Sequence, residues 1–224
     1  MEPQFDRIAL PSLVDESHRQ IKTRILSGEL QPGSPLRDSV LARAMGVSRS
    51  PVREALRLLE QSGLVVKAAN YSYRVAAVDA EDAAELAALR LADEGLAVRV
   101  IVRDRIAIDS LAPLLEDIRS APVGTLDAAS ADAAFHTAVV ALAGLRRLSA
   151  RHADLADQTR LMLLSRDVPL SYDQEAVWRR HVELYEALAA AIGSGDPSEV
   201  LTAWEAHVTH AVVAASQVET QPAG

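Results

Sequence analysis

Residues 46 to 60, GVSRSPVREALRLLE, carry the most restrictive pattern in the chain, because their apolar side chains recur at i, i+3, i+4 and i+7. Those side chains are Val52, Ala55, Leu56 and Leu59. This spacing predicts an α-helix that is buried on one side. Ser48 can cap the helix, Pro51 falls in its first turn, where a missing N–H costs nothing, and Gly63 can end it.

The same helix carries Arg49, Arg53 and Arg57 at intervals of four. At 100° per residue such positions drift by only about 40°, so the three arginines form one cationic ridge opposite the buried stripe. Guanidinium groups match phosphate oxygens and the major-groove edge of guanine. The ridge therefore predicts DNA binding, against the alternative of an ordinary solvated helix face.

The charge distribution supports this prediction. Residues 1 to 77 hold 11 Lys and Arg against 8 Asp and Glu, whereas residues 78 to 224 hold 12 against 23. Although the formal net charge of the whole chain is -8, residues 1 to 77 are therefore net positive and residues 78 to 224 are net negative. Such asymmetry favours a nucleic-acid-binding module attached to a domain of a different kind.

The flanking segments predict a winged helix-turn-helix. A first helix is expected over residues 15 to 28, and QPGSP at 31 to 35 forms a turn cluster. A short second helix follows and ends at Gly46, with one side formed by Val40, Leu41, Ala44 and Met45. The β-prone runs LVVKA and YRVAAV then form a ribbon that ends near residue 77.

From residue 80 onward only helical patterns occur. The expected helices span residues 80–104, 109–120, 127–143, 145–166, 171–193 and 196–218. We therefore predict a mainly α protein, with a winged helix-turn-helix over residues 1–78 and an all-α antiparallel bundle over residues 79–224. The chain has no cysteine, no secretory signal pattern and no apolar run of membrane-spanning length, so we expect a cytoplasmic protein without membrane contact.

Five of the six histidines follow residue 130. Asp132 and His136 are four apart and can point to the same place, although such a pair alone is usually a surface contact. His181 and His207 each share a helical face with apolar residues, so we expect both to point inward. Three histidines and one carboxylate suit a divalent ion such as zinc, with nickel or manganese also possible. We expect His152 to be an ordinary surface residue.

The stretch GELQPGSPLRDSVLARAMGVSRSPVREALRLLEQSGLV resembles the N-terminal domain of GntR-type bacterial transcription regulators, through PG, LA, GVSR, PVREAL and GLV. The helical remainder is similar to the FCD domain of the FadR branch. The resemblance implies that Ser48, Arg49, Ser50 and Arg53 touch operator DNA, with Arg57 beside them. On the preceding helix, Arg37 and Arg43 can add backbone contacts. Two departures are Ser39, where relatives often have Arg, and AANYSYR, where the wing tip often has Gly.

The FCD resemblance implies the metal ligands Asp132, His136, His181 and His207. The last two are usually about one helical turn closer together in that domain, a spacing that would select Tyr185. An extra turn near AAAIGSGDP restores His181, which is the interpretation we favour. His210 is a competing last ligand.

The resemblance also implies a small carboxylate effector, gripped by Arg90 on the first bundle helix, with Arg160 as a further candidate. From orientation alone, Arg90 could equally form a helical ion pair with Glu94. The Asn that commonly follows the Asp/His helix is replaced near Leu145.

Together these features predict a transcription regulator and not an enzyme. It would bind a palindromic operator as a homodimer, under the control of a carboxylate effector at the metal site. Two alternatives remain open at this point. One is the same regulator with a metal-free organic or acyl effector pocket, and the other is a metal-dependent hydrolase.

Overall fold

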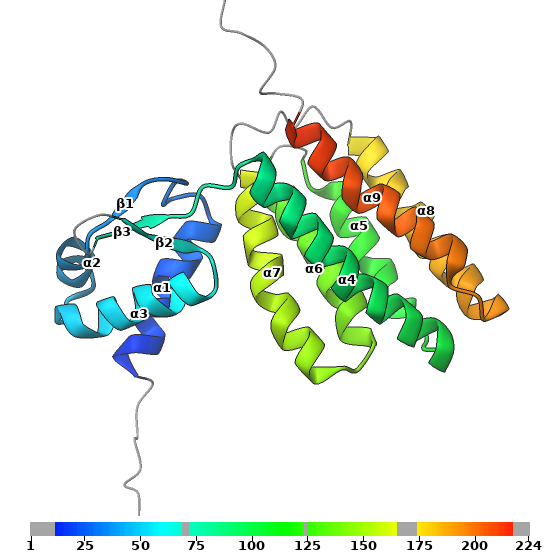
Figure 1. Ribbon diagram of the computed structural model, residues 1–224, viewed down its shortest axis with the longest axis horizontal. Helices are drawn as coiled ribbons and strands as arrows, with labels where there is room; N and C mark the ends of the chain where they lie inside the picture. Colours follow the sequence, from blue (N-terminus) through cyan, green and yellow to red (C-terminus); the bar gives the residue numbers. More distant parts are fainter. Residues whose placement is uncertain (1–11, 69–71, 123–124, 165–173, 217–224) are drawn as a thin grey trace, which may run out of the picture. The chain divides into compact units, whose positions relative to one another are not determined.

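The protein is described by a computed structural model over residues 12–68, 72–122, 125–164 and 174–216. The chain divides into two compact units, Met1–Ala76 and Ala77–Gly224. The first unit is a small helical domain with a three-stranded sheet, and the second is a bundle of helices (Figure 1). The predicted fold class is confirmed.

The first unit has the element order of a winged helix-turn-helix. It comprises α1 (Leu13–Leu26), β1 (Pro35–Leu36), α2 (Asp38–Met45), α3 (Arg49–Gln61), β2 (Val65–Ala68) and β3 (Ser72–Val75). The sheet has the order β1-β3-β2 and is antiparallel, with Leu36 opposite Tyr73 and Val65 opposite Val75. The sequence predicted only a turn where β1 begins. Its two residues become a strand by pairing with β3, a contact that no local pattern marks.

The core of this unit lies between α1, α3 and the sheet. Its fully buried side chains include Ile21, Ile25, Val52, Ala55, Leu56, Leu59, Leu64 and Val75. Of the apolar side predicted for α2, Leu41 and Met45 are half-buried, whereas Val40 is 58% exposed and Ala44 is exposed. The buried residue of this helix is Ala42. Gly46 adopts φ 67 and ends α2 in the left-handed conformation that favours glycine. Ser48 stands at the N-cap position of α3 but makes no side-chain capping hydrogen bond.

The described part of the second unit is helical. They are α4 (Ala80–Asp104), the 3-10 turn η2 (Asp109–Leu111), α5 (Ala112–Ser120), α6 (Leu126–Leu142), α7 (Arg146–Leu164), α8 (Gln174–Ser194) and α9 (Ser198–Ser216). A reciprocal capping box between Asp79 and Asp82 starts α4, and Arg105, at φ 51, ends it. Gly144 and Gly195 adopt positive φ in the turns before α7 and α9.

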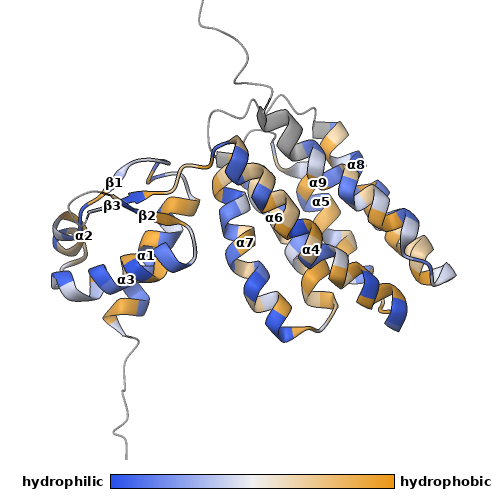
Figure 2. Cartoon of the chain, viewed as in Figure 1, coloured by the Kyte–Doolittle hydropathy of each residue, from blue (hydrophilic) through white to orange (hydrophobic). Residues whose placement is uncertain are grey.

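The long helix α4 packs on α6, α7, α8 and α9, so it contacts most of the bundle (Figure 1). The bundle helices carry both apolar and polar residues (Figure 2), and the main core is built from the apolar ones. Its largest fully buried side chains are Phe135, Trp204, Ile101, Leu111 and Leu184. Among the described helices, none is long and apolar enough to cross a membrane.

Candidate functional site

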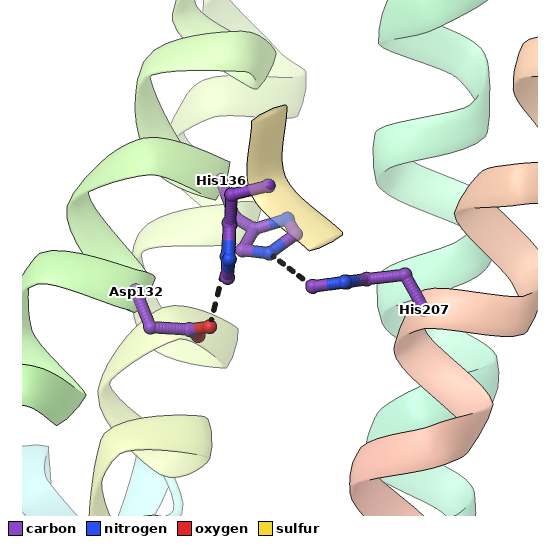
Figure 3. A group of neighbouring side chains, drawn as sticks. Asp132, His136 and His207 are labelled. Atoms are coloured by element: carbon purple, nitrogen blue, oxygen red, sulfur yellow. Dashed lines mark hydrogen bonds and ion pairs between the residues drawn. The ribbon is translucent and has the colours of Figure 1, made fainter. Parts of the chain in front are cut away.

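Four polar side chains meet inside the bundle at the junction of α6, α8 and α9. Asp132 and His136 come from α6, His181 from α8 and His207 from α9, and one ligand atom of each lies within 4.8 Å of the others. Figure 3 shows Asp132, His136 and His207 directed toward a common point. The structure thus brings together the four side chains that the sequence singled out. Tyr185 instead packs against the hydrophobic core, and His210 is exposed.

Hydrogen bonds on the far side of two rings fix their orientation. The Nδ1 atom of His181 lies 2.9 Å from the carbonyl oxygen of Val177, and a carbonyl can only accept, so Nδ1 carries the hydrogen. The Nδ1 atom of His136 lies 2.8 Å from Oε2 of Glu94 and donates to that carboxylate. In both rings the Nε2 lone pair therefore points into the cluster, as metal ligation requires.

The contacts within the cluster suit a bound cation. The Nε2 atoms of His136 and His207 lie 3.2 Å apart, and Nε2 of His181 lies 3.2 Å from Oδ1 of Asp132. A neutral His207 can donate from Nε2 to His136, but the His181 Nε2 lone pair and the Asp132 oxygen repel unless a proton or metal ion lies between them. His181 Nε2 is also buried without a hydrogen-bond partner in the described chain. This donor set, three nitrogens and one oxygen, fits a divalent transition-metal ion.

The protonation states favour the same role. Burial lowers the pKa of His136 and lowers that of His207 well below its ordinary value, so both rings are neutral at pH 7. Burial alone would raise the pKa of Asp132. The neighbouring His181 and His136 rings and the Arg90 guanidinium outweigh it, so this pKa is lowered and the carboxylate is ionised.

Glu94 supports the cluster from α4 and is fully buried. Its carboxylate accepts hydrogen bonds from His136, from Trp204 Nε1 at 2.6 Å and from Arg90 Nε at 2.8 Å. Although burial opposes ionisation, the charge of Arg90 and the hydrogen bonds from His136 and Arg90 hold the pKa of Glu94 far below its ordinary value. Sequence reasoning considered Glu94 only as an ion-pair partner of Arg90. Its bond to His136, which lies 42 positions away, leaves no signal in the sequence.

Arg90 is 6% exposed and pairs with Glu94, as one of the two interpretations of the sequence required. Its Nη2 atom is buried and has no hydrogen-bond partner in the described chain. A charged donor in this position is available to an anion at the cluster. Arg160, the other predicted effector contact, lies half-buried on α7, and its Nε atom is also buried without a described hydrogen-bond partner.

The expectation of a surface position for His152 was wrong, because this residue is 1% exposed. It lies on the face of α7 that packs on α4, where its Nδ1 atom is 3.8 Å from Oδ2 of the buried Asp93. Asp93 also pairs with Arg151. The signal that sequence reasoning missed is the helical stripe Leu148, His152, Leu155 and Thr159, all buried.

The predicted DNA-binding ridge is exposed on α3. The side chains of Arg49, Arg53 and Arg57 are 59%, 60% and 48% exposed. Asp38 at the start of α2 binds two of them, with Oδ1 3.0 Å from Arg49 Nη2 and Oδ2 2.8 Å from Arg53 Nε. Asp38 thus holds two arginines side by side, a role that sequence reasoning missed.

The other predicted contacts lie on the same unit. Arg57 pairs with Glu54 one turn earlier on α3. The remaining predicted DNA contacts, all exposed, are Arg37, Arg43, Ser48 and Ser50. Residues 69–71 of the atypical wing lie outside the described residues, and the strands on either side of them, β2 and β3, form the predicted ribbon.

Comparison with known families identifies this arrangement. Residues 13–75 match the model of bacterial regulatory proteins of the gntR family, and residues 81–210 match that of the FCD domain. The chain belongs to the GntR family. It is therefore a DNA-binding transcriptional regulator with an FCD domain, and the prediction that it is not an enzyme is confirmed by its family and relatives.

Full-length relatives of this GntR-family regulator include named repressors. A relative from Paenarthrobacter nicotinovorans, named as a probable D-xylose utilization operon transcriptional repressor, is 28% identical over 93% of this chain and 91% of its own. The repressor GlaR of Escherichia coli K12 is 28% identical over 86% of this chain and 91% of its own. The regulator YdhC of Bacillus subtilis is 36% identical, over 38% of each chain.

Solved structures share the fold of this regulator. A GntR transcriptional regulator from Rhodococcus sp. RHA1 has a TM-score of 0.77 and covers 95% of this chain and 100% of its own, at 22% identity. Escherichia coli McbR/YncC has a TM-score of 0.68 and covers 93% of this chain and 99% of its own, at 21% identity. At these identities the likeness establishes the fold alone.

The first prediction concerns Glu94. Glu94→Gln preserves the shape of the side chain but removes the charge that orients His136, so we expect zinc affinity to fall by about 10- to 100-fold. Competition with a chromogenic chelator measures this affinity, and circular dichroism checks the fold. Glu183→Gln, an exposed substitution on α8, is the matched control. Unchanged zinc affinity in a folded Glu94→Gln protein would contradict the role assigned to this carboxylate.

The second prediction concerns His152, whose pKa burial lowers from 6.5 to about 4. As the pH falls below 6.5, His152 becomes protonated in the unfolded chain but stays neutral in the folded chain. The free energy of unfolding therefore decreases as the pH falls from 6.5 to about 4. Between pH 7 and pH 5, protonation of His152 in the unfolded chain should lower the free energy of unfolding by about 2 kcal/mol. Urea unfolding should show a correspondingly smaller acid loss for His152→Gln, but not for the exposed-site control His210→Gln. If His152→Gln and the wild type lost the same free energy of unfolding between pH 7 and pH 5, the role assigned to His152 would be refuted.

Proposed function

We propose that this regulator is a homodimeric repressor that binds a palindromic operator through α3 and responds to a small carboxylate bound at a metal ion. The main observation in support is the four-residue cluster. Within it, hydrogen bonds at Nδ1 direct the Nε2 lone pairs of His136 and His181 toward the other ligands. The repressor role is supported by two relatives of matching length that are named repressors.

Asp132, His136, His181 and His207 would hold the ion, with zinc favoured by three imidazoles and nickel or manganese as alternatives. A divalent ion with an open coordination position supplies a binding point for a carboxylate oxygen. The buried Nη2 of Arg90 would donate to the same anion, while Nε of Arg90 stays bound to Glu94. Arg160 is a second candidate donor.

On the DNA side, Arg49 and Arg53 would contact phosphates and base edges, together with the exposed Ser48, Ser50 and Arg57. A single α3 reads only a few base pairs, so a two-fold dimer supplies the second half-site about one helical turn away. Effector binding would shift the relative placement of the two DNA-binding units. The protein would act in the cytoplasm, where a bacterial operator lies.

The third prediction tests the DNA contacts. Replacing Arg49 and Arg53 together with alanine removes two guanidinium groups, so affinity for a duplex selected from the genome by the protein should fall at least tenfold. The slope of log affinity against log salt should also decrease by about two. Fluorescence anisotropy across a salt series measures both quantities. Arg179→Ala, which removes an exposed arginine on α8, should change neither. An unaltered salt slope in the folded double variant would eliminate the assignment.

The fourth prediction tests the metal. Elemental analysis of protein purified without an affinity tag should find about one divalent transition-metal ion per chain, and His136→Ala should lose it. Small carboxylates such as citrate should raise the melting temperature of the metal-loaded protein and not of protein stripped with EDTA. Stabilisation that survives stripping would instead support the metal-free effector pocket.

A further inference from the structure

Asp38 links the scaffold of the DNA-binding unit to the arginine ridge. It is the first residue of α2, which packs against α3 (Figure 1). Its side chain is 17% exposed, whereas those of Arg49 and Arg53 are 59% and 60% exposed. Its oxygens lie 3.0 and 3.1 Å from Arg49 Nη2, and Oδ2 lies 2.8 Å from Arg53 Nε. A largely buried carboxylate thus holds two exposed cations of another helix.

Asp38 is ionised at neutral pH. Burial would raise its pKa, but hydrogen bonds from Arg49 and Arg53 outweigh burial and lower it. Its position in the first turn of α2 also favours a negative charge, because the N-terminal end of a helix carries a partial positive charge. Asp38 therefore cancels one of the two positive charges of the arginines that it binds.

The hydrogen bonds to Asp38 leave most donors of both arginines free. Within the described chain Arg53 donates only through Nε, and Arg49 donates only through Nη2. A guanidinium group carries its N–H donors in a rigid plane, and two of them together match O6 and N7 of guanine. Arg53 thus keeps Nη1 and Nη2 available for such a pair, while its bond to Asp38 restricts their orientation before DNA binds.

We propose that Asp38 makes the ridge selective, because it positions Arg49 and Arg53 for guanine edges and weakens their attraction to phosphates. Guanine O6 and N7 are neutral acceptors, so their recognition depends on where the donors are held. Phosphates are charged and occur along every duplex, so the attraction to them depends on net charge. Asp38 is a positioning residue, which acts through the two arginines and does not itself contact DNA.

Restricting the arginines before binding lowers the cost of ordering them on a base. This benefit reaches only the complex in which they meet a guanine. The inference rests on the proposed contact of Arg49 and Arg53 with base edges. It adds that a third side chain, on a different helix, decides how well those contacts distinguish one duplex from another.

Glu54 and Arg57 provide an internal comparison. Glu54 is 45% exposed, lies on α3 itself and accepts from Nε and Nη2 of Arg57. An exposed pair within one helix exchanges with water at little cost. Glu54 therefore cancels a positive charge of the ridge, as Asp38 does, but it does not attach the ridge to a second helix.

The first test compares Asp38→Asn with Glu54→Gln, because each removes one negative charge beside the ridge. The probes are a duplex selected by the wild type from a randomised pool and a shuffled duplex of equal composition. Fluorescence anisotropy measures both affinities, and circular dichroism checks the fold. Asp38→Asn should strengthen binding of the shuffled duplex and reduce the ratio of specific to shuffled affinity at least about tenfold.

Glu54→Gln is the matched control. It should strengthen binding of both duplexes alike and leave the affinity ratio within about threefold of the wild type. Asp38→Ser, which also suits the start of a helix, is a second variant and should behave as Asp38→Asn does. An unchanged ratio in either folded Asp38 variant, or an equal reduction by Glu54→Gln, would overturn the proposal.

The second test asks whether Asp38 acts through Arg53. Sequencing the duplexes retained from a randomised pool gives the base preference at each position. Arg53→Ala should relax the preference for a guanine, and Asp38→Asn should relax it at the same position. In an Arg53→Ala background, Asp38→Asn should change the affinity ratio by no more than about threefold.

The results separate this inference from the proposed function on which it rests. If Arg53→Ala relaxes a guanine preference that Asp38→Asn leaves intact, the base contact stands and the positioning role of Asp38 is overturned. An undiminished effect of Asp38→Asn in the Arg53→Ala background would overturn it as well. If Arg53→Ala relaxes no position, the proposed base contact of Arg53 fails, and the role of Asp38 fails with it.

Discussion

The hydrogen-bonded, buried carboxylate of Glu94 is the interaction on which the FCD domain depends. It accepts from Arg90 on its own helix, from His136 on α6 and from Trp204 on α9, and so joins three helices at one point. An ionised group without solvent is stable only when its hydrogen-bonding capacity is filled. Filling it here sets the direction of the His136 ring, whose Nε2 faces His207 in the four-residue cluster.

A second shared carboxylate organises the DNA-binding unit. Asp38 holds Arg49 and Arg53 while both remain about 60% exposed. This pairing removes part of the positive charge of the ridge in the free protein, and phosphate oxygens would compete for the same donors. The two units thus use one principle differently. Burial makes Glu94 a fixed structural point, whereas exposure leaves the Asp38 pairs exchangeable.

Much of the fold and of the candidate site could be predicted because the relevant patterns are local. The buried stripe of α3, the exposed arginines and the order of the bundle helices followed from helical periodicity. His152 was misjudged because a lone histidine says little about burial, although Leu148, Leu155 and Thr159 mark its face as buried. Only part of the apolar side predicted for α2 is covered, since an eight-residue helix offers too few positions to fix which side its neighbours cover.

The sequence by itself determined the helical periods, the charge asymmetry between the two units and the histidines available for a cluster, because these depend only on residue type and spacing. Tertiary structure alone decided that His181 and not Tyr185 joins Asp132, His136 and His207. It also decided that Glu94 orients His136. Both outcomes depend on where helices distant in the sequence come to rest against one another, and packing of the whole core sets those positions.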